Sequence, residues 1–149
     1  VGAATEAELI ERYDRVDDAL NATKAAISEG ILPGGGVALV RAYLEVKNAE
    51  DEESNSSVKA GLNIISQACK DPFRQIVING GKNPDSYLEK VFNQNVSDGF
   101  DFRNDSFGDM FELGIVDPFK VTRCALENAA SAATALLLVG SAMVEEKNN

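Results

Sequence analysis

Asp18 is the first residue of this sequence whose type and position could carry chemistry. At about 100° per residue of a helix, it falls opposite an apolar stripe that includes Val16 and Leu20. Ala22 and Ala25 share its side, so a second element could approach the carboxylate closely. The same pattern is more often produced by a carboxylate on a solvated helix face. The pattern alone leaves both interpretations open.

The glycine run Gly34 to Gly36 is the second candidate. Three glycines expose backbone amides and could let the chain lie flat against a base or a phosphate. No Gly-Lys-Ser/Thr follows, and the spacing is not that of a dinucleotide fingerprint. The run is therefore a hinge, a ligand-contacting turn or both, and the pattern alone favours a plain hinge or turn.

An acidic segment rich in aromatic residues is the third candidate. Its carboxylates are Asp98, Asp101, Asp105, Asp109, Glu112 and Asp117. Their spacing does not fit a calcium loop, so we expect most of them to form turns and caps. Asp117, followed by Pro118, has the sequence of a helix N-cap with proline in the first turn.

The composition excludes several classes of function. The chain has 149 residues, a formal net charge of −10 and no histidine, and its two cysteines, Cys69 and Cys124, lie far apart. The charge argues against nucleic-acid binding, and the missing histidine excludes the common zinc and Cys–His sites. No positively charged start comes before an apolar stretch, so we expect no secretory signal. The apolar stretch 129–144 is interrupted by polar residues and predicts a buried core helix, so we expect no membrane span.

The expected fold is mainly α with a minor β component. A capping box at Thr5 and Glu8 starts the first helix, and Gly30 ends it. The other expected elements are a helix starting inside the glycine run, an exposed acidic loop at 48–57, a helix from Val58 that restarts at Pro72 and stops at Gly80, a short helix from Pro84, a hairpin arm at 99–102, a last helix from Phe119 to about Gly140, and a terminal strand at 143–144.

Several motifs together resemble the group I chaperonins, the GroEL family. They are Val-Gly-Ala-Ala-Thr-Glu at 1–6, Arg-Val-Asp-Asp-Ala-Leu-Asn-Ala-Thr at 15–23, Glu-Gly-Ile-Leu-Pro-Gly-Gly-Gly-Val-Ala-Leu at 29–39, Pro-Phe-Arg-Gln-Ile-Val-Ile-Asn at 72–79 and Gly-Ile-Val-Asp-Pro-Phe-Lys-Val-Thr-Arg at 114–123. They occur in the order and at the spacing of that family. The similarity extends from Val1 to about Val144.

The resemblance implies two parts of a larger protein. Residues 1–30 correspond to the C-terminal part of an intermediate domain, and residues 31–149 to the C-terminal part of an equatorial, ATP-binding domain. The family's phosphate loop, its Mg²⁺-binding aspartate and its apical domain have no counterpart here, so the ligands of Mg²⁺ are expected in a missing N-terminal half. We therefore expect apolar patches that normally face that half.

The resemblance also assigns roles to individual residues. Asp18 takes the place of the catalytic aspartate that activates the water attacking ATP. The residues placed around the nucleotide are Gly34, Gly35, Asp101, Phe102, Arg103, Ile115 and Asp117. Many members have small residues where Phe102 and Arg103 stand, so contacts to the base are expected to differ here. Pro33 stands where the family usually has a small or aliphatic residue.

The implied function is that of an ATP-dependent chaperone. Such a protein forms a homo-oligomeric double ring and handles unfolded client proteins and a co-chaperonin through its apical domain. The expected location is the cytoplasm or an organelle matrix. The alternative is a non-catalytic helical fragment that acts only as a folding or interaction module, and in either case we expect the isolated segment to be inactive as an ATPase.

Overall fold

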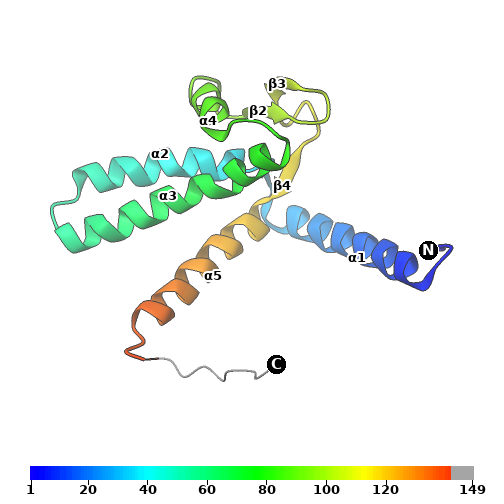
Figure 1. The fold of residues 1–149 in the computed structure, drawn as a ribbon, viewed down its shortest axis with the longest axis horizontal. Helices are drawn as coiled ribbons and strands as arrows, with labels where there is room; N and C mark the ends of the chain where they lie inside the picture. The colour runs from blue at the N-terminus through cyan, green and yellow to red at the C-terminus, as the bar shows by residue number, and fades with distance from the viewer. Residues whose placement is uncertain (142–149) are drawn as a thin grey trace.

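The computed structural model describes residues 1–141 and consists mainly of helices (Figure 1). Its elements are α1 (Glu6–Glu29), β1 (Ile31–Pro33), α2 (Val37–Glu52), α3 (Ser56–Asn79), α4 (Pro84–Phe92), β2 (Asp98–Asp101), β3 (Ser106–Asp109), β4 (Val116–Pro118) and α5 (Phe119–Leu137). The mainly α prediction is confirmed. The expected strand at 143–144 lies outside the described residues.

The ends of α1 follow from local signals. The Thr5 hydroxyl accepts a hydrogen bond from the Glu8 amide at 3.3 Å, and the Glu8 carboxylate accepts one from the Ala4 amide. This arrangement satisfies amides that have no partner within the helix. Gly30 ends the helix at φ +89, a backbone conformation that favours glycine. The predicted boundaries of this helix are confirmed.

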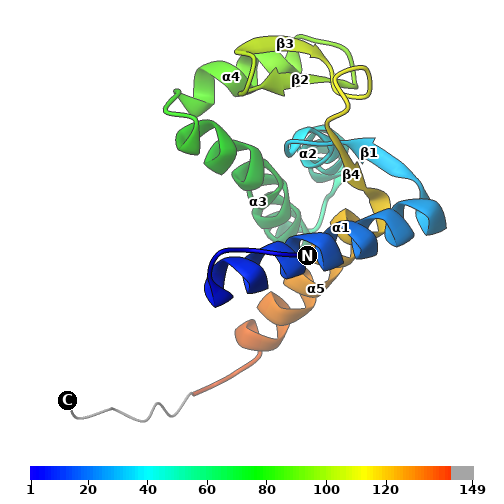
Figure 2. The same cartoon turned by 90° about the vertical axis from the view of Figure 1, so that its right-hand side faces the viewer.

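Helices α2 and α3 lie side by side and build the core (Figures 1 and 2). Val40 of α2 and Phe73 and Val77 of α3 are fully buried there. The connection is short, because Asn55 caps α3 by accepting hydrogen bonds from the amides of Ser57 and Val58. The core therefore rests on two antiparallel helices joined by a tight turn.

The acidic loop predicted at 48–57 is confined to residues 53–55, and the rest of that prediction is wrong. Helix α2 continues to Glu52, and Glu50 is 4% exposed. The Glu50 carboxylate lies 3.0 Å from the Lys47 ammonium and accepts a hydrogen bond from the Asn63 amide of α3 at 3.2 Å. Lys47 and Asn63 compensate the charge of the buried Glu50 carboxylate. The acidic residues 50–52 can therefore be part of the helix.

Pro72 lies inside α3 and does not restart a helix. Proline removes one intrahelical hydrogen bond and usually disfavours a helix interior. Here Cys69 and Phe73 on either side of it are both 1% exposed. Burial of these neighbours favours a continuous helix over the break that local propensity predicts.

The hairpin expected around 99–102 is confirmed. Strands β2 and β3 pair antiparallel, with Phe100 opposite Phe107. Tyr87 of α4 packs edge-on against Phe100 at a ring-centroid distance of 4.7 Å. Aromatic packing therefore joins the hairpin to α4.

A second ladder, which sequence patterns did not predict, pairs β1 with β4. Leu32 lies opposite Asp117 in antiparallel register. Asp117 is therefore a strand residue, and Pro118 occupies the N-cap position of α5 without any side-chain cap. The prediction that Asp117 caps the last helix is wrong, because pairing with a distant strand fixes its backbone.

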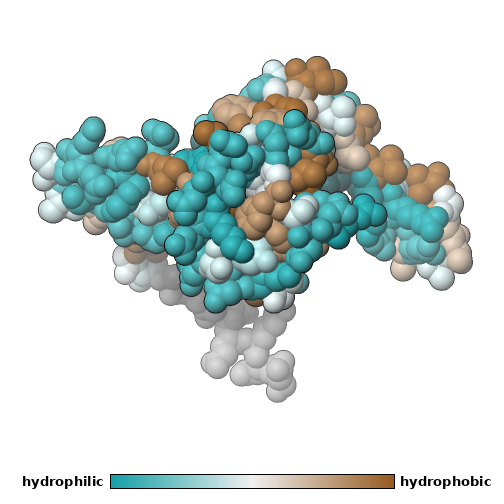
Figure 3. All heavy atoms as spheres, turned by 90° about the horizontal axis from the view of Figure 1, so that it is seen from above, coloured by the Kyte–Doolittle hydropathy of each residue, from teal (hydrophilic) through white to brown (hydrophobic). Residues whose placement is uncertain are grey.

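Apolar surface is exposed on α1 and α5. Neither helix has a buried residue, and the exposed large side chains include Val16, Leu20, Ile27, Leu136, Leu137 and Leu138. Figure 3 shows hydrophobic patches over the centre and along one arm of the molecule. The predicted apolar patches are therefore present, whereas the predicted buried helix at 129–144 is exposed as far as it is described. No helix within residues 1–141 has the length and hydropathy to cross a bilayer.

Replacing Phe73 by alanine should destabilise the fold by about 3–5 kcal/mol, because it removes a fully buried ring from the core. Phe111→Ala is the matched control, since that ring is 44% exposed. Urea unfolding of both variants, followed by circular dichroism, checks this. Equal losses of stability would contradict the assigned core.

Candidate functional site

The ladder between β1 and β4 brings the glycine run next to two other predicted site residues. The Gly34 amide donates a hydrogen bond to the Ile115 carbonyl at 2.9 Å, and Asp117 lies opposite Leu32 in the ladder. Gly34 is far in the sequence from Ile115 and Asp117. The structure thus assembles one cluster out of two segments that were singled out separately.

Each glycine of the run has its own structural requirement. A Cβ on Gly34 would lie 3.0 Å from the Ile115 carbonyl oxygen, and one on Gly36 would lie 2.9 Å from the Phe73 backbone. Gly35 and Gly36 also have φ of +66 and +80, which side chains disfavour. The run is a tightly packed turn, which supports the turn interpretation over a loose hinge. Gly30, by contrast, has nothing within 4 Å of its Cβ position.

Asp117 lies at the edge of a cavity of about 360 Å³ between α2, α3 and α5, which Gly36 and Pro72 also line. Burial raises the pKa of the Asp117 carboxyl above its usual value. Within residues 1–141 no side-chain hydrogen bond reaches this carboxylate. A half-buried acceptor without a donor is suited to bind a ligand hydroxyl.

The other predicted contacts, Asp101 to Arg103, lie at the end of the β2–β3 hairpin. Asp101 is 6% exposed and accepts hydrogen bonds from the Arg103 amide at 2.8 Å and from Asn104. These bonds, the one from Arg103 first, hold the pKa of Asp101 below its usual value. Arg103 is exposed and Phe102 is half-buried. None of the three lines the described cavity at Asp117, so their place beside a base stays a prediction.

Asp18 is exposed on α1. The alanines on its side of the helix face other elements: Ala22 lines a hollow with Val116 of β4, and Ala25 lines a cleft with Cys124 of α5. The close approach predicted for this side of the helix is confirmed. The catalytic role of Asp18 stays a prediction.

An ion pair ties the C-terminal end of α1 to α5. The Arg123 guanidinium donates two hydrogen bonds to the Glu29 carboxylate, at 2.7 and 3.1 Å, and also binds Glu127 of its own helix. Hydrogen bonding from Arg123 lowers the pKa of Glu29. Figure 1 shows the end of α1 close to the start of α5, from where the two helices diverge. The pair therefore helps to set the direction in which α1 carries Asp18.

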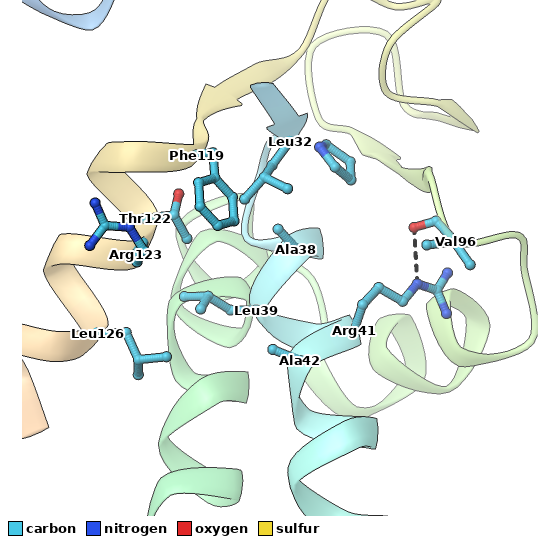
Figure 4. A pocket seen from close by; sticks show the side chains of 11 residues that line it. Leu32, Ala38, Leu39, Arg41, Ala42, Val96, Phe119, Thr122, Arg123 and Leu126 are labelled. Atoms are coloured by element: carbon cyan, nitrogen blue, oxygen red, sulfur yellow. Dashed lines mark hydrogen bonds between the residues drawn. The ribbon is translucent and has the colours of Figure 1, made fainter. Parts of the chain in front are cut away.

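Arg41 of α2 organises the loop that leads into the hairpin. Its guanidinium donates a hydrogen bond to the Val96 carbonyl at 3.1 Å (Figure 4). It also donates to the carbonyls of Val91, at 2.9 Å, and of Asn95. Val91 lies in the last turn of α4, and Asn95 and Val96 follow that helix. The end of a helix leaves carbonyl acceptors unpaired. Sequence patterns did not single out Arg41, because its partners lie about fifty residues away.

No cluster of three or more histidine, cysteine, aspartate or glutamate side chains that could hold a metal ion exists within residues 1–141. The carboxylates around the hairpin are used by turns. Asp109, for example, accepts hydrogen bonds from Ser97 and from the Phe111 amide.

Comparison with known proteins gives a consistent result. A sequence profile of the TCP-1/cpn60 chaperonin family matches residues 1–147. A protein named chaperonin GroEL 3 from Psychromonas ingrahamii is 46% identical over all 149 residues, which span 27% of its length. A crystal structure of a group III chaperonin in the open state superimposes with a TM-score of 0.84 at 31% identity, covering 96% of this chain and 30% of that one.

Glu29→Gln should loosen α1 from α5, because it removes the charged partner of Arg123. Hydrogen exchange in the C-terminal half of α1 should accelerate, whereas the control Glu11→Gln, which breaks a pair inside α1, should leave that region unchanged. Acid should have the same effect: the pKa of Glu29 is lowered, so its contribution is complete above the usual glutamate pKa and is lost as the pH falls through the lowered value. Unchanged exchange in Glu29→Gln would contradict this role.

Arg41→Met should release the loop at 93–97, since several backbone carbonyls lose the charged donor that they share. We expect a loss of about 1.5–3 kcal/mol and faster hydrogen exchange in that loop. Arg74→Met is the control, because Arg74 makes a surface ion pair with Asp85 at 3.2 Å. An equal effect of both substitutions would refute the assignment.

Proposed function

This chain belongs to the TCP-1/cpn60 chaperonin family, and we propose that it forms part of an ATP-dependent chaperone that assists protein folding in an oligomeric ring. It spans about a quarter to a third of the length of the relatives described above. The proposal therefore concerns a segment that supplies one part of a nucleotide site and one catalytic carboxylate. The remaining parts of the site would come from a longer polypeptide.

The carboxylate of Asp117 carries this proposal. It is half-buried beside the glycine turn, has a raised pKa and lacks a hydrogen-bond donor among the described residues. The hydroxyls of a ribose are donors that would satisfy it. The Gly35 backbone, bare of a side chain, could then lie against the nucleotide, with Gly34 and Ile115 holding the turn in place.

Asp18 would act on the water that attacks the terminal phosphate. A carboxylate can accept a proton from such a water and orient it. Its exposure on a helix without buried residues suits a group that reaches the substrate only when domains close. Mg²⁺ would neutralise charge on the phosphates, but no described cluster in this chain fits it. Its ligands would lie elsewhere in the protein.

The partners and location follow from the same proposal. Unfolded client proteins and a co-chaperonin would bind through a domain outside this segment, and copies would assemble into a double ring in the cytoplasm or an organelle matrix. The net charge of −10 disfavours nucleic acid as a partner. The second candidate, a non-catalytic interaction module, is favoured only by the exposed apolar faces of α1 and α5.

A chimaera tests the catalytic proposal. This chain replaces the matching segment of the Psychromonas relative, and ATP turnover is measured with Asp18→Ala and with Asp17→Ala, its exposed neighbour. We expect Asp18→Ala to slow turnover about 10²–10⁴-fold while ATP still binds, and Asp17→Ala to be near normal. Equal turnover in both variants would sink the catalytic assignment.

The nucleotide half-site is tested separately. Asp117→Ala in the same chimaera should weaken ATP binding about 10–100-fold, the value of a hydrogen bond to a charged group. Asp71→Ala, which removes an exposed carboxylate from α3, should have no effect. Calorimetric titration with a non-hydrolysable ATP analogue measures both. Undiminished affinity in Asp117→Ala would leave the non-catalytic module as the better function.

A further inference from the structure

Gly80 follows the last residue of α3, and a side chain at this position is excluded although its backbone conformation would allow one. Its φ of −77 and ψ of 3 are open to any residue. Yet a Cβ at this position would lie 2.5 Å from Cδ1 and 2.9 Å from Cε1 of Phe102. Real side chains do not approach that closely, so the Phe102 ring occupies the space that a side chain at position 80 would fill.

The Phe102 ring is held in this place from other directions too. It packs edge-on against Phe100 at a ring-centroid distance of 4.7 Å and stacks with Tyr87 at 6.1 Å. An ion pair of 2.9 Å between Lys82 and Asp105 joins the same two segments a few residues further on. The end of α3 and the turn of the hairpin therefore form one packed unit, in which the ring cannot move aside without losing these contacts.

We propose that Gly80 is a specificity-determining residue that seats the Phe102 ring against α3 and so keeps it out of the space for the nucleotide base. The proposal rests on the proposed function, in which the neighbours Asp101 and Arg103 lie beside that base. A bulky residue at position 102 is compatible with a purine only if its ring is stored elsewhere. The space left by the missing side chain of Gly80 holds the ring. Gly80 therefore acts through Phe102 and does not contact the ligand.

The packing of the Phe102 ring against Gly80, called the seat below, can be tested in this chain without nucleotide. Gly80→Ala should raise the equilibrium constant of unfolding at least about fivefold, the lower end of overpacking effects. In the Phe102→Ala background the same change should be neutral or stabilising, because alanine suits this backbone and restricts the unfolded chain. Gly61→Ala is the matched control, since its Cβ position has nothing within 4 Å. Additive effects of the two substitutions would refute the seat.

Base selection is tested in the chimaera, with MgATP and MgGTP as the probes. Gly80→Ala should weaken ATP binding about tenfold with kcat changed less than about twofold, because the displaced ring enters the base site. Adding Phe102→Ala should restore the affinity, a rescue that general destabilisation would not give. The affinities of Phe102→Ala alone for MgATP and MgGTP show whether the seated ring contacts the base.

Three outcomes would overturn the proposal. They are normal ATP affinity in Gly80→Ala, no rescue by the second substitution, and a loss of affinity in Phe102→Ala alone, which would mean that the ring contacts the base. A wild-type chimaera that assembles but binds no nucleotide would instead refute the proposed function and with it the role in base selection. The unfolding measurements would still decide whether the seat exists.

Discussion

The chain passes from β1 into α2 through a gap that admits only glycine. Gly34 lies against the backbone of Ile115 and the start of β4, and Gly36 lies against the backbone of Phe73 in the C-terminal half of α3. Any Cβ at either position would push apart the strand ladder or the helix pair that forms the core. This close approach explains why α2, α3 and β4 meet at one point, and why Asp117 comes to lie at the edge of a cavity next to that point.

The glycine turn and α1 are attached to the rest of the molecule in different ways. The glycine turn and Asp117 belong to the packed part of the molecule, whereas α1 has no buried residue and is tied down near Gly30 by the pair between Glu29 and Arg123. In the proposed function the nucleotide would rest on the rigid part, and Asp18 would be carried by the movable part. In that function the geometry would separate nucleotide binding from hydrolysis, which suits a machine driven by domain closure.

Local signals predicted what local interactions decide. The ends of α1 were predictable because Thr5 and Gly30 act within a few residues of themselves. Asp117 was misassigned as a cap because its strand partner, Leu32, is remote in the sequence, and the burial of Glu50 depends on a side chain from the next helix. For the candidate site, periodicity gave only an exposed carboxylate and a glycine turn. The chaperonin family was identified from the order and spacing of several motifs. Periodicity, capping and charge patterns do not identify a family.

In the proposed function this chain holds one part of a nucleotide site and not a complete one. Native mass spectrometry of the purified 149-residue chain, with and without MgATP, tests it most directly. We expect a monomer or a small oligomer, associated through its exposed apolar faces, that retains no nucleotide. A ring-sized assembly that carries ATP would contradict it, because the residues of this chain would then suffice for binding.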